Sequence, residues 1–111
     1  AGLDSTVTGD TIDTTGSIDN SPTAFSTGTE QYLLDVNESV DTQTNGSIDA
    51  EYDGSSSGGT FNGTALEPIA SGTGATSTYT FTMVANANIA GLTQAANDYT
   101  DTWTVVAAGN F

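Results

Sequence analysis

The sequence predicts an all-β fold, a small immunoglobulin-like β-sandwich. Three observations support this prediction: apolar and polar residues alternate in several segments, no segment shows a helical period, and stretches rich in Gly, Ser and Asn separate the segments. Strict alternation is typical of antiparallel strands that bury one face, and several short strands at this spacing are typical of a sandwich. The 111 residues suffice for one domain with a modest core.

The first predicted element is an extended N-terminal segment, residues 3–11. Its apolar face carries less bulk than a strand that fills its own core, which suits a groove with shallow pockets. We therefore predict that residues 1–15 are an N-terminal extension acting as a donor strand, and that residues 16–111 form a single β-sandwich completed by such a strand. An ordinary edge strand or a loose tail is the alternative. The predicted donor residues are Leu3, Ser5, Val7, Gly9, Thr11 and Ile12.

Four further segments alternate in the same way and are predicted as half-buried strands. They comprise residues 31–37, 46–53, 78–84 and 99–106. The side chains expected on their buried faces are Tyr32, Leu34 and Val36; Ile48, Ala50 and Tyr52; Tyr79, Phe81 and Met83; and Tyr99, Trp103 and Val105.

The composition excludes whole classes of function. The chain has 14 Asp and Glu residues, no Lys, Arg, His or Cys, and a formal charge of -14. No side chain can neutralise a phosphate, so we expect no nucleic-acid partner. The usual general bases, thiol nucleophiles and imidazole or thiolate metal ligands are absent too, so we predict that the protein is not an enzyme. Without disulfides or Lys and Arg ion pairs, stability must come from burial, backbone ladders or a neighbouring subunit.

Several features indicate an extracellular protein. No apolar run approaches the ~18 residues of a membrane helix, so we expect no membrane span. The chain begins at Ala1 rather than Met, which we interpret as a mature, secreted product. Three sequons make Asn37, Asn45 and Asn62 candidate glycosylation sites.

Two segments resemble one class of secreted structural proteins. The run Thr6-Val7-Thr8-Gly9-Asp10-Thr11-Ile12, followed by Gly16-Ser17-Ile18, resembles the start of chaperone-usher fimbrial subunits, where a T-V-x-G-x-[TV]-[VI] extension precedes the first strand. The closing residues 97–106 are similar to the G-x-Y-x-D-x-[VLW]-x-V last strand of spore-coat-U-like secreted pilins. Both motifs consist mostly of strand pattern and together cover a minor part of the chain.

The resemblance implies a sandwich that lacks one strand and receives the N-terminal extension of the next subunit. Gly9 would then match the small donor residue that lets two backbones approach closely. The chain departs from many such pilins in having no Cys, and it is shorter than a typical major fimbrial subunit. An open sheet edge is a strong pairing site, and head-to-tail pairing propagates. We therefore predict a homopolymeric subunit of a cell-surface pilus or fimbria, with host-surface or biofilm contacts.

The alternative prediction is a secreted, monomeric binding module. Calcium is one candidate ligand, because Asp49, Glu51 and Asp53 would share one strand face, although no EF-hand loop is present. Carbohydrate is the other, because aromatic rings stack on sugars when they are exposed. The candidate rings are Tyr32, Tyr52, Tyr79, Tyr99 and Trp103, which the alternation places on apolar faces.

Overall fold

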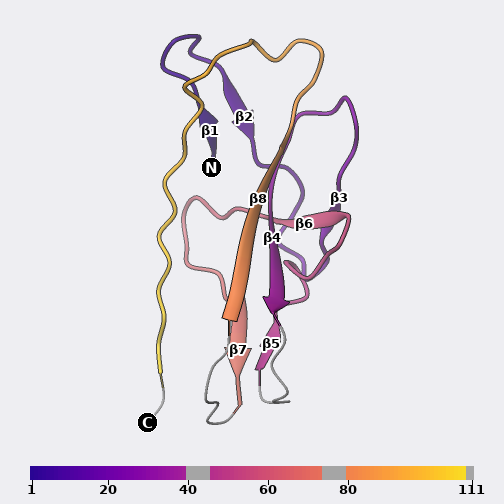
Figure 1. The fold of residues 1–111 in the computed structure, drawn as a ribbon, viewed down its shortest axis with the longest axis vertical. Coiled ribbons are helices and arrows are strands. Elements are labelled where there is room, and N and C mark those ends of the chain that lie inside the picture. The colour runs from indigo at the N-terminus through magenta and orange to yellow at the C-terminus, as the bar shows by residue number, and fades with distance from the viewer. Residues whose placement is uncertain (40–45, 74–79, 110–111) are drawn as a thin grey trace.

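The computed structural model describes residues 1–39, 46–73 and 80–109. Within these ranges every regular element is a strand, which confirms the predicted all-β class, and the arrangement is compatible with a small β-sandwich (Figure 1). The Cα extents of 47 × 24 × 23 Å make the molecule elongated. The strands are β1 (Gly2–Asp4), β2 (Thr11–Asp13), β3 (Thr23–Ala24), β4 (Gln31–Ser39), β5 (Gly46–Ile48), β6 (Ser57–Thr60), β7 (Ala70–Gly72) and β8 (Thr80–Asn88).

The main sheet has four strands in the order β3-β6-β4-β8, and its central strand is β4. The strand predicted over residues 31–37 is confirmed, because β4 covers it and buries Tyr32, Leu34 and Val36. Leu33, on the opposite face, is fully buried as well. This strand is thus covered on both faces, which explains its run of large apolar residues.

At one end of the main sheet lies β8, whose nine residues all pair with β4. The strand predicted over residues 78–84 therefore exists, although it runs further, and Thr78 and Tyr79 lie outside the described residues. Phe81 and Met83 pack against the core as predicted. Because β8 is an end strand, its outer edge has no ladder partner in the described part of the chain. The core around it consists of Leu34, Val36 and Tyr52, with Ile48, Phe61 and Ile69 packed against them.

The N-terminal segment folds back on itself, so the prediction of one continuous strand over residues 3–11 is wrong for the isolated chain. Strands β1 and β2 form an antiparallel hairpin in which Leu3 lies opposite Ile12. The chain reverses in the loop of residues 5–10, where Gly9 has a φ of 71°. Its amide donates to the Ser5 carbonyl oxygen at 2.9 Å. A left-handed glycine closes the turn and breaks the alternation.

The strand predicted over residues 46–53 is also wrong beyond Ile48, where β5 ends. The Asp49 carboxylate accepts a hydrogen bond from the Glu51 amide at 3.0 Å, and the Asp49 carbonyl accepts one from the Tyr52 amide at 2.9 Å. An Asp that bonds the backbone two residues on is typical of a turn. The turn moves Glu51 to the interior, while Tyr52 keeps its predicted place in the core.

The last predicted strand, residues 99–106, lacks a ladder. Thr100 forms a single bridge with Asp4, and residues 101–109 have no regular structure and are exposed. This C-terminal segment runs down one side of the molecule (Figure 1). No described strand pairs with residues 101–109, so this alternating sequence does not form a strand in the isolated chain.

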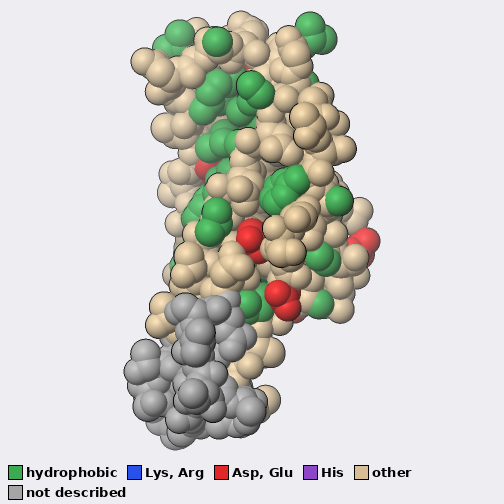
Figure 2. All heavy atoms as spheres, turned by 45° about the vertical axis from the view of Figure 1, so that its right-hand side comes forward, with side chains coloured by type: hydrophobic (Ala, Val, Ile, Leu, Met, Phe, Trp, Pro, Cys, Tyr) green, Lys and Arg blue, Asp and Glu red, His purple; other side chains and the backbone are tan. Residues whose placement is uncertain are grey.

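The surface combines acidic and apolar side chains without any basic one. Figure 2 shows one face, on which hydrophobic side chains are interspersed with a few carboxylates. Several large apolar side chains are exposed in the loops, including Val7, Ile89 and Leu92.

Candidate functional site

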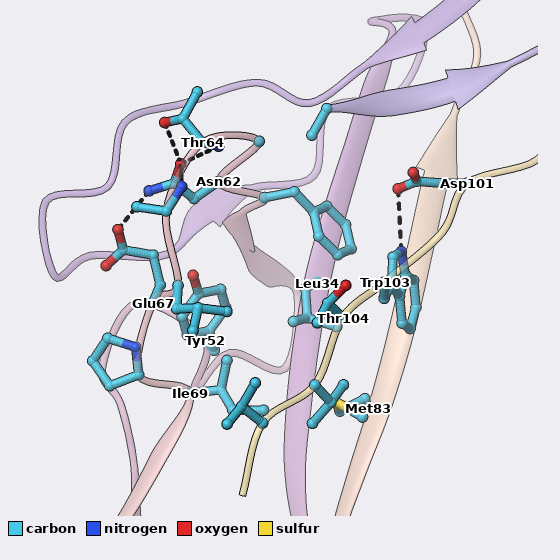
Figure 3. Close-up of a pocket in the computed structure, with 18 of the residues that line it drawn as sticks. Leu34, Tyr52, Asn62, Thr64, Glu67, Ile69, Met83, Asp101, Trp103 and Thr104 are labelled. Carbon is cyan, nitrogen blue, oxygen red and sulfur yellow. Dashed lines mark hydrogen bonds between the residues drawn. The ribbon is translucent and has the colours of Figure 1, made fainter.

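A trough runs along the inner face of the β4-β8 pair, and the C-terminal segment forms its outer wall. It consists of two hollows of about 840 and 420 Å³, which both border Asp101 and Trp103. Figure 3 shows the larger hollow, with Trp103 and Thr104 coming from the C-terminal segment. We use the name trough for the space between residues 101–106 and a floor made of Tyr32, Leu34, Met83, Ala85 and Ala87.

The floor follows from the register of the main sheet. Leu34 pairs with Ala85 and Tyr32 pairs with Ala87, and side chains of paired residues lie on the same face. The two alanines are exposed, because their small side chains leave the space above them unfilled. The floor is therefore an apolar strip that follows β8 and has room for further side chains.

An aromatic contact holds the outer wall in place. The Trp103 indole N–H donates to the Tyr32 hydroxyl at 2.7 Å and to the Asp101 carboxylate at 3.2 Å. The indole lies 5.3 Å from the Phe61 ring, which stacks on Tyr32 at 4.5 Å. Burial, with the nearby Asp101 charge, raises the pKa of Tyr32 to about 12. The Tyr32 hydroxyl therefore stays protonated at neutral pH, and its oxygen accepts the hydrogen bond from the Trp103 indole.

The loop of residues 61–69 borders the larger hollow and contains one candidate glycosylation site, Asn62. Its side-chain oxygen accepts hydrogen bonds from the amides of Thr64 and Ala65 at 2.9 and 3.1 Å, and its amide group donates to Glu67. Asn37 is exposed on β4, and Asn45 lies outside the described residues. Glycosylation of the three sequons stays a prediction.

The predicted donor residues lie in the hairpin rather than in a free extension. Leu3 borders the smaller hollow, Ser5 is buried, and Val7 is 75% exposed. Thr11 donates its hydroxyl to Asp4 at 2.7 Å. A Cβ added at Gly9 would meet nothing within 4 Å, so close approach of another backbone does not require glycine there in the isolated chain. The left-handed φ of this residue is what favours glycine. Donation of these residues to another subunit stays a prediction.

Two carboxylates join the hairpin loop to the segment that precedes the outer wall. Asp98 accepts four hydrogen bonds: from the Ser5 hydroxyl at 2.6 Å, from the Thr6 amide and hydroxyl at 2.8 Å, and from the Val7 amide at 2.9 Å. In return, Asp10 accepts a bond from the Gln94 amide at 3.0 Å and a longer one, at 3.3 Å, from the Tyr99 hydroxyl, which also donates to the Gln94 carbonyl oxygen at 2.8 Å. We call this reciprocal arrangement the clasp.

Hydrogen bonding favours the ionised form of the Asp98 carboxylate. The Ser5 hydroxyl, followed by the Thr6 hydroxyl and the amides of Val7 and Thr6, lowers the pKa of Asp98 to about 2. Sequence reasoning missed this role, because the clasped residues are 91–93 positions apart and no local motif announces their contact.

The three acidic residues considered for calcium do not come together. Glu51 is buried, and its carboxylate accepts hydrogen bonds from the amides of Asp19 and Ser21 at 3.1 Å and of Thr60 at 3.2 Å. Asp49 closes the turn, and Asp53 is exposed. The prediction that the three share a strand face is wrong, because the turn separates them. Over the described ranges, no group of three acidic side chains could hold a metal ion.

Comparisons with known proteins give no family. No family model matches the chain, and neither a curated protein nor a solved structure matches it. The resemblance of residues 6–12 and 97–106 to fimbrial subunits and secreted pilins therefore stays a prediction. In the described ranges, no helix is long and apolar enough to span a membrane.

Proposed function

We propose that the protein is a structural subunit of an extracellular filament that polymerises by strand donation. Each subunit would place its N-terminal segment, residues 1–12, in the trough of the next. The observation that carries this proposal is the trough itself, a space whose apolar floor includes Met83, Ala85 and Ala87 of the outer strand β8.

Both sides of the trough offer backbone groups to an inserted strand. Along residues 83–88, which border the trough, the outer edge of β8 has no ladder partner among the described residues, and the C-terminal segment has none beyond Thr100. An unpaired edge is a template for another strand. A donated segment would pair with β8 on one side and with the C-terminal segment on the other. Trp103 and Val105 would then belong to a paired strand.

The energetics favour donation for some residues more than for others. Val7 is 75% exposed, so its burial in the trough would contribute about 1.5 to 3 kcal/mol. Ile12 is already buried in the hairpin and gains little. New ladder bonds would add about 0.5 to 1.5 kcal/mol each and must offset an association cost of several kcal/mol. Backbone pairing along β8 therefore supplies much of the stabilisation.

A covalent lock tests whether the N-terminal segment leaves its own chain. Asp4 and Thr100 exchange backbone hydrogen bonds in both directions, at 2.9 and 3.0 Å. The Cα atoms of such a pair lie about 5.5 Å apart, a separation that suits a disulfide. Because the chain has no Cys, Asp4→Cys with Thr100→Cys would form a single disulfide. We expect no filaments from the oxidised variant and filaments after reduction, as seen by negative-stain microscopy.

The matched control is Ser47→Cys with Ser71→Cys, which links β5 to β7. These residues are paired and exposed, and their hydroxyls lie 3.4 Å apart. The oxidised control should assemble like the unmodified chain. Filaments from the oxidised Asp4 and Thr100 pair would contradict donation of residues 1–12.

The trough also favours a second candidate, a monomeric carbohydrate-binding module. Trp103 is 39% exposed beside Asp101, and an indole next to a carboxylate suits a sugar ring. Tyr32 and Tyr52, by contrast, are core residues. Two results would support this candidate over the filament. The chain would stay monomeric at high concentration, and it would bind soluble glycans saturably, with the binding lost in Trp103→Ala.

A further inference from the structure

The hairpin loop is held in its own chain mainly through the side chains of two acidic residues. Strands β1 and β2 pair at only three positions. The loop between them is fastened to the other end of the chain by the clasp, in which Asp98 and Asp10 together accept six hydrogen bonds. Donation of residues 1–12 requires every one of these bonds to break.

We propose that the clasp is an autoinhibitory latch that limits how fast the N-terminal segment becomes available to a neighbouring subunit. This inference rests on the proposed function, because it concerns the release of the same segment. The latch keeps a newly folded subunit monomeric, and it is undone when an acceptor trough offers the segment more backbone bonds than the clasp does.

The geometry suits a releasable fastening. Thr6 and Val7 are exposed, so water can replace the bonds that Asp98 accepts from them. The chain has no Lys, Arg or His, so no side-chain cation holds Asp98 in place. The charged and titratable groups of the clasp region are Asp98, Asp10 and Tyr99, with Glu30 close enough to act on Tyr99, and their negative charges repel one another when ionised. Hydrogen bonds alone hold the clasp closed.

Removing the Asp98 carboxylate tests the latch in the full chain. The variant is Asp98→Ala, and its matched control is Asp53→Ala, which removes one acid from an exposed position. Two quantities are measured: hydrogen exchange of the Thr6 and Val7 amides in dilute monomer, and the lag time of filament formation. We expect Asp98→Ala to raise exchange at both amides about tenfold or more and to shorten the lag several-fold, while the control matches the unmodified chain.

A second variant, Asp10→Ala, opens the other half of the clasp and should also shorten the lag. Unchanged exchange of the β4 amides shows in both variants that the domain stays folded. Faster exchange with an unchanged lag would overturn the latch and leave strand donation standing. Unchanged exchange at Thr6 and Val7 would overturn it as well, because Asp98 would then not hold the loop. Absence of filaments from every chain, the unmodified one included, would overturn the proposed function and the latch with it.

Discussion

Asp98 makes the N-terminal loop sensitive to strong acid. Its folded pKa of about 2 lies below the ordinary value of 3.8, so the stability it contributes is complete above about pH 4 and is lost as the pH falls through 2. The facing groups are the hydroxyls of Ser5 and Thr6 and the amides of Thr6 and Val7. We expect the Thr6 and Val7 amide chemical shifts, measured by NMR, to be constant from neutral pH to about 4 and to titrate near 2. A transition at pH 5 or 6 would contradict the assignment.

Glu51 is a second acidic residue with a structural role, and we expect a large loss of stability when its side chain is removed. Its buried carboxylate accepts bonds from three backbone amides. Glu51→Ala leaves those amides without partners, so we expect the free energy of unfolding to fall by about 3 kcal/mol or more. The exposed Asp53→Ala should change it by less than about 0.5 kcal/mol. Urea denaturation measures both, and equal midpoints for the two variants would contradict this role.

Among the strands, alternation was a good guide where the segment also has a partner in the fold. Residues 31–37 and 78–84 both carry strong apolar alternation, and they meet as β4 and β8. Residues 99–106 alternate just as clearly but form no ladder, because a strand requires a neighbour as well as a pattern. Over residues 46–53 the pattern failed for a local reason, the turn that Asp49 closes. The trough and the clasp depend on contacts between distant residues, which a single sequence does not display.

Removal of the N-terminal segment tests its role as an element. Without residues 1–12, the chain loses Ile12, which is 4% exposed, and the bridge to Thr100. We expect monomers of reduced stability and a higher Tm when a synthetic peptide of residues 1–12 is added. The same peptide carrying Gly9→Leu should raise the Tm less, because the donor register places Gly9 against the acceptor backbone. Normal filaments from the truncated chain would show that the segment is not the donor.

The charge of the whole molecule predicts how the proposed filaments would associate. Eleven of the 14 acidic residues lie in residues 1–53, and no Lys or Arg offsets them. Filaments should therefore repel one another over a Debye length of about 8 Å at physiological salt. We expect lateral bundling when calcium or magnesium bridges carboxylates or when the pH approaches ~4, measured by light scattering. Monovalent salt at equal ionic strength is the control. Scattering that responds to neither pH nor divalent ions would contradict this account.

The clasp also orders the events of folding. Pairing Leu3 with Ile12 closes a short local loop, whereas the bonds to Asp98 join residues 91–93 positions apart. Closing a loop about ten times longer costs roughly 2 kcal/mol more in chain entropy. We therefore expect the hairpin to form before the clasp closes, with an interval in which the loop is formed but not fastened. During that interval, closure within one molecule competes with capture by another. If the proposed donation occurs, the concentration at which subunits fold would then affect the ratio of monomer to polymer.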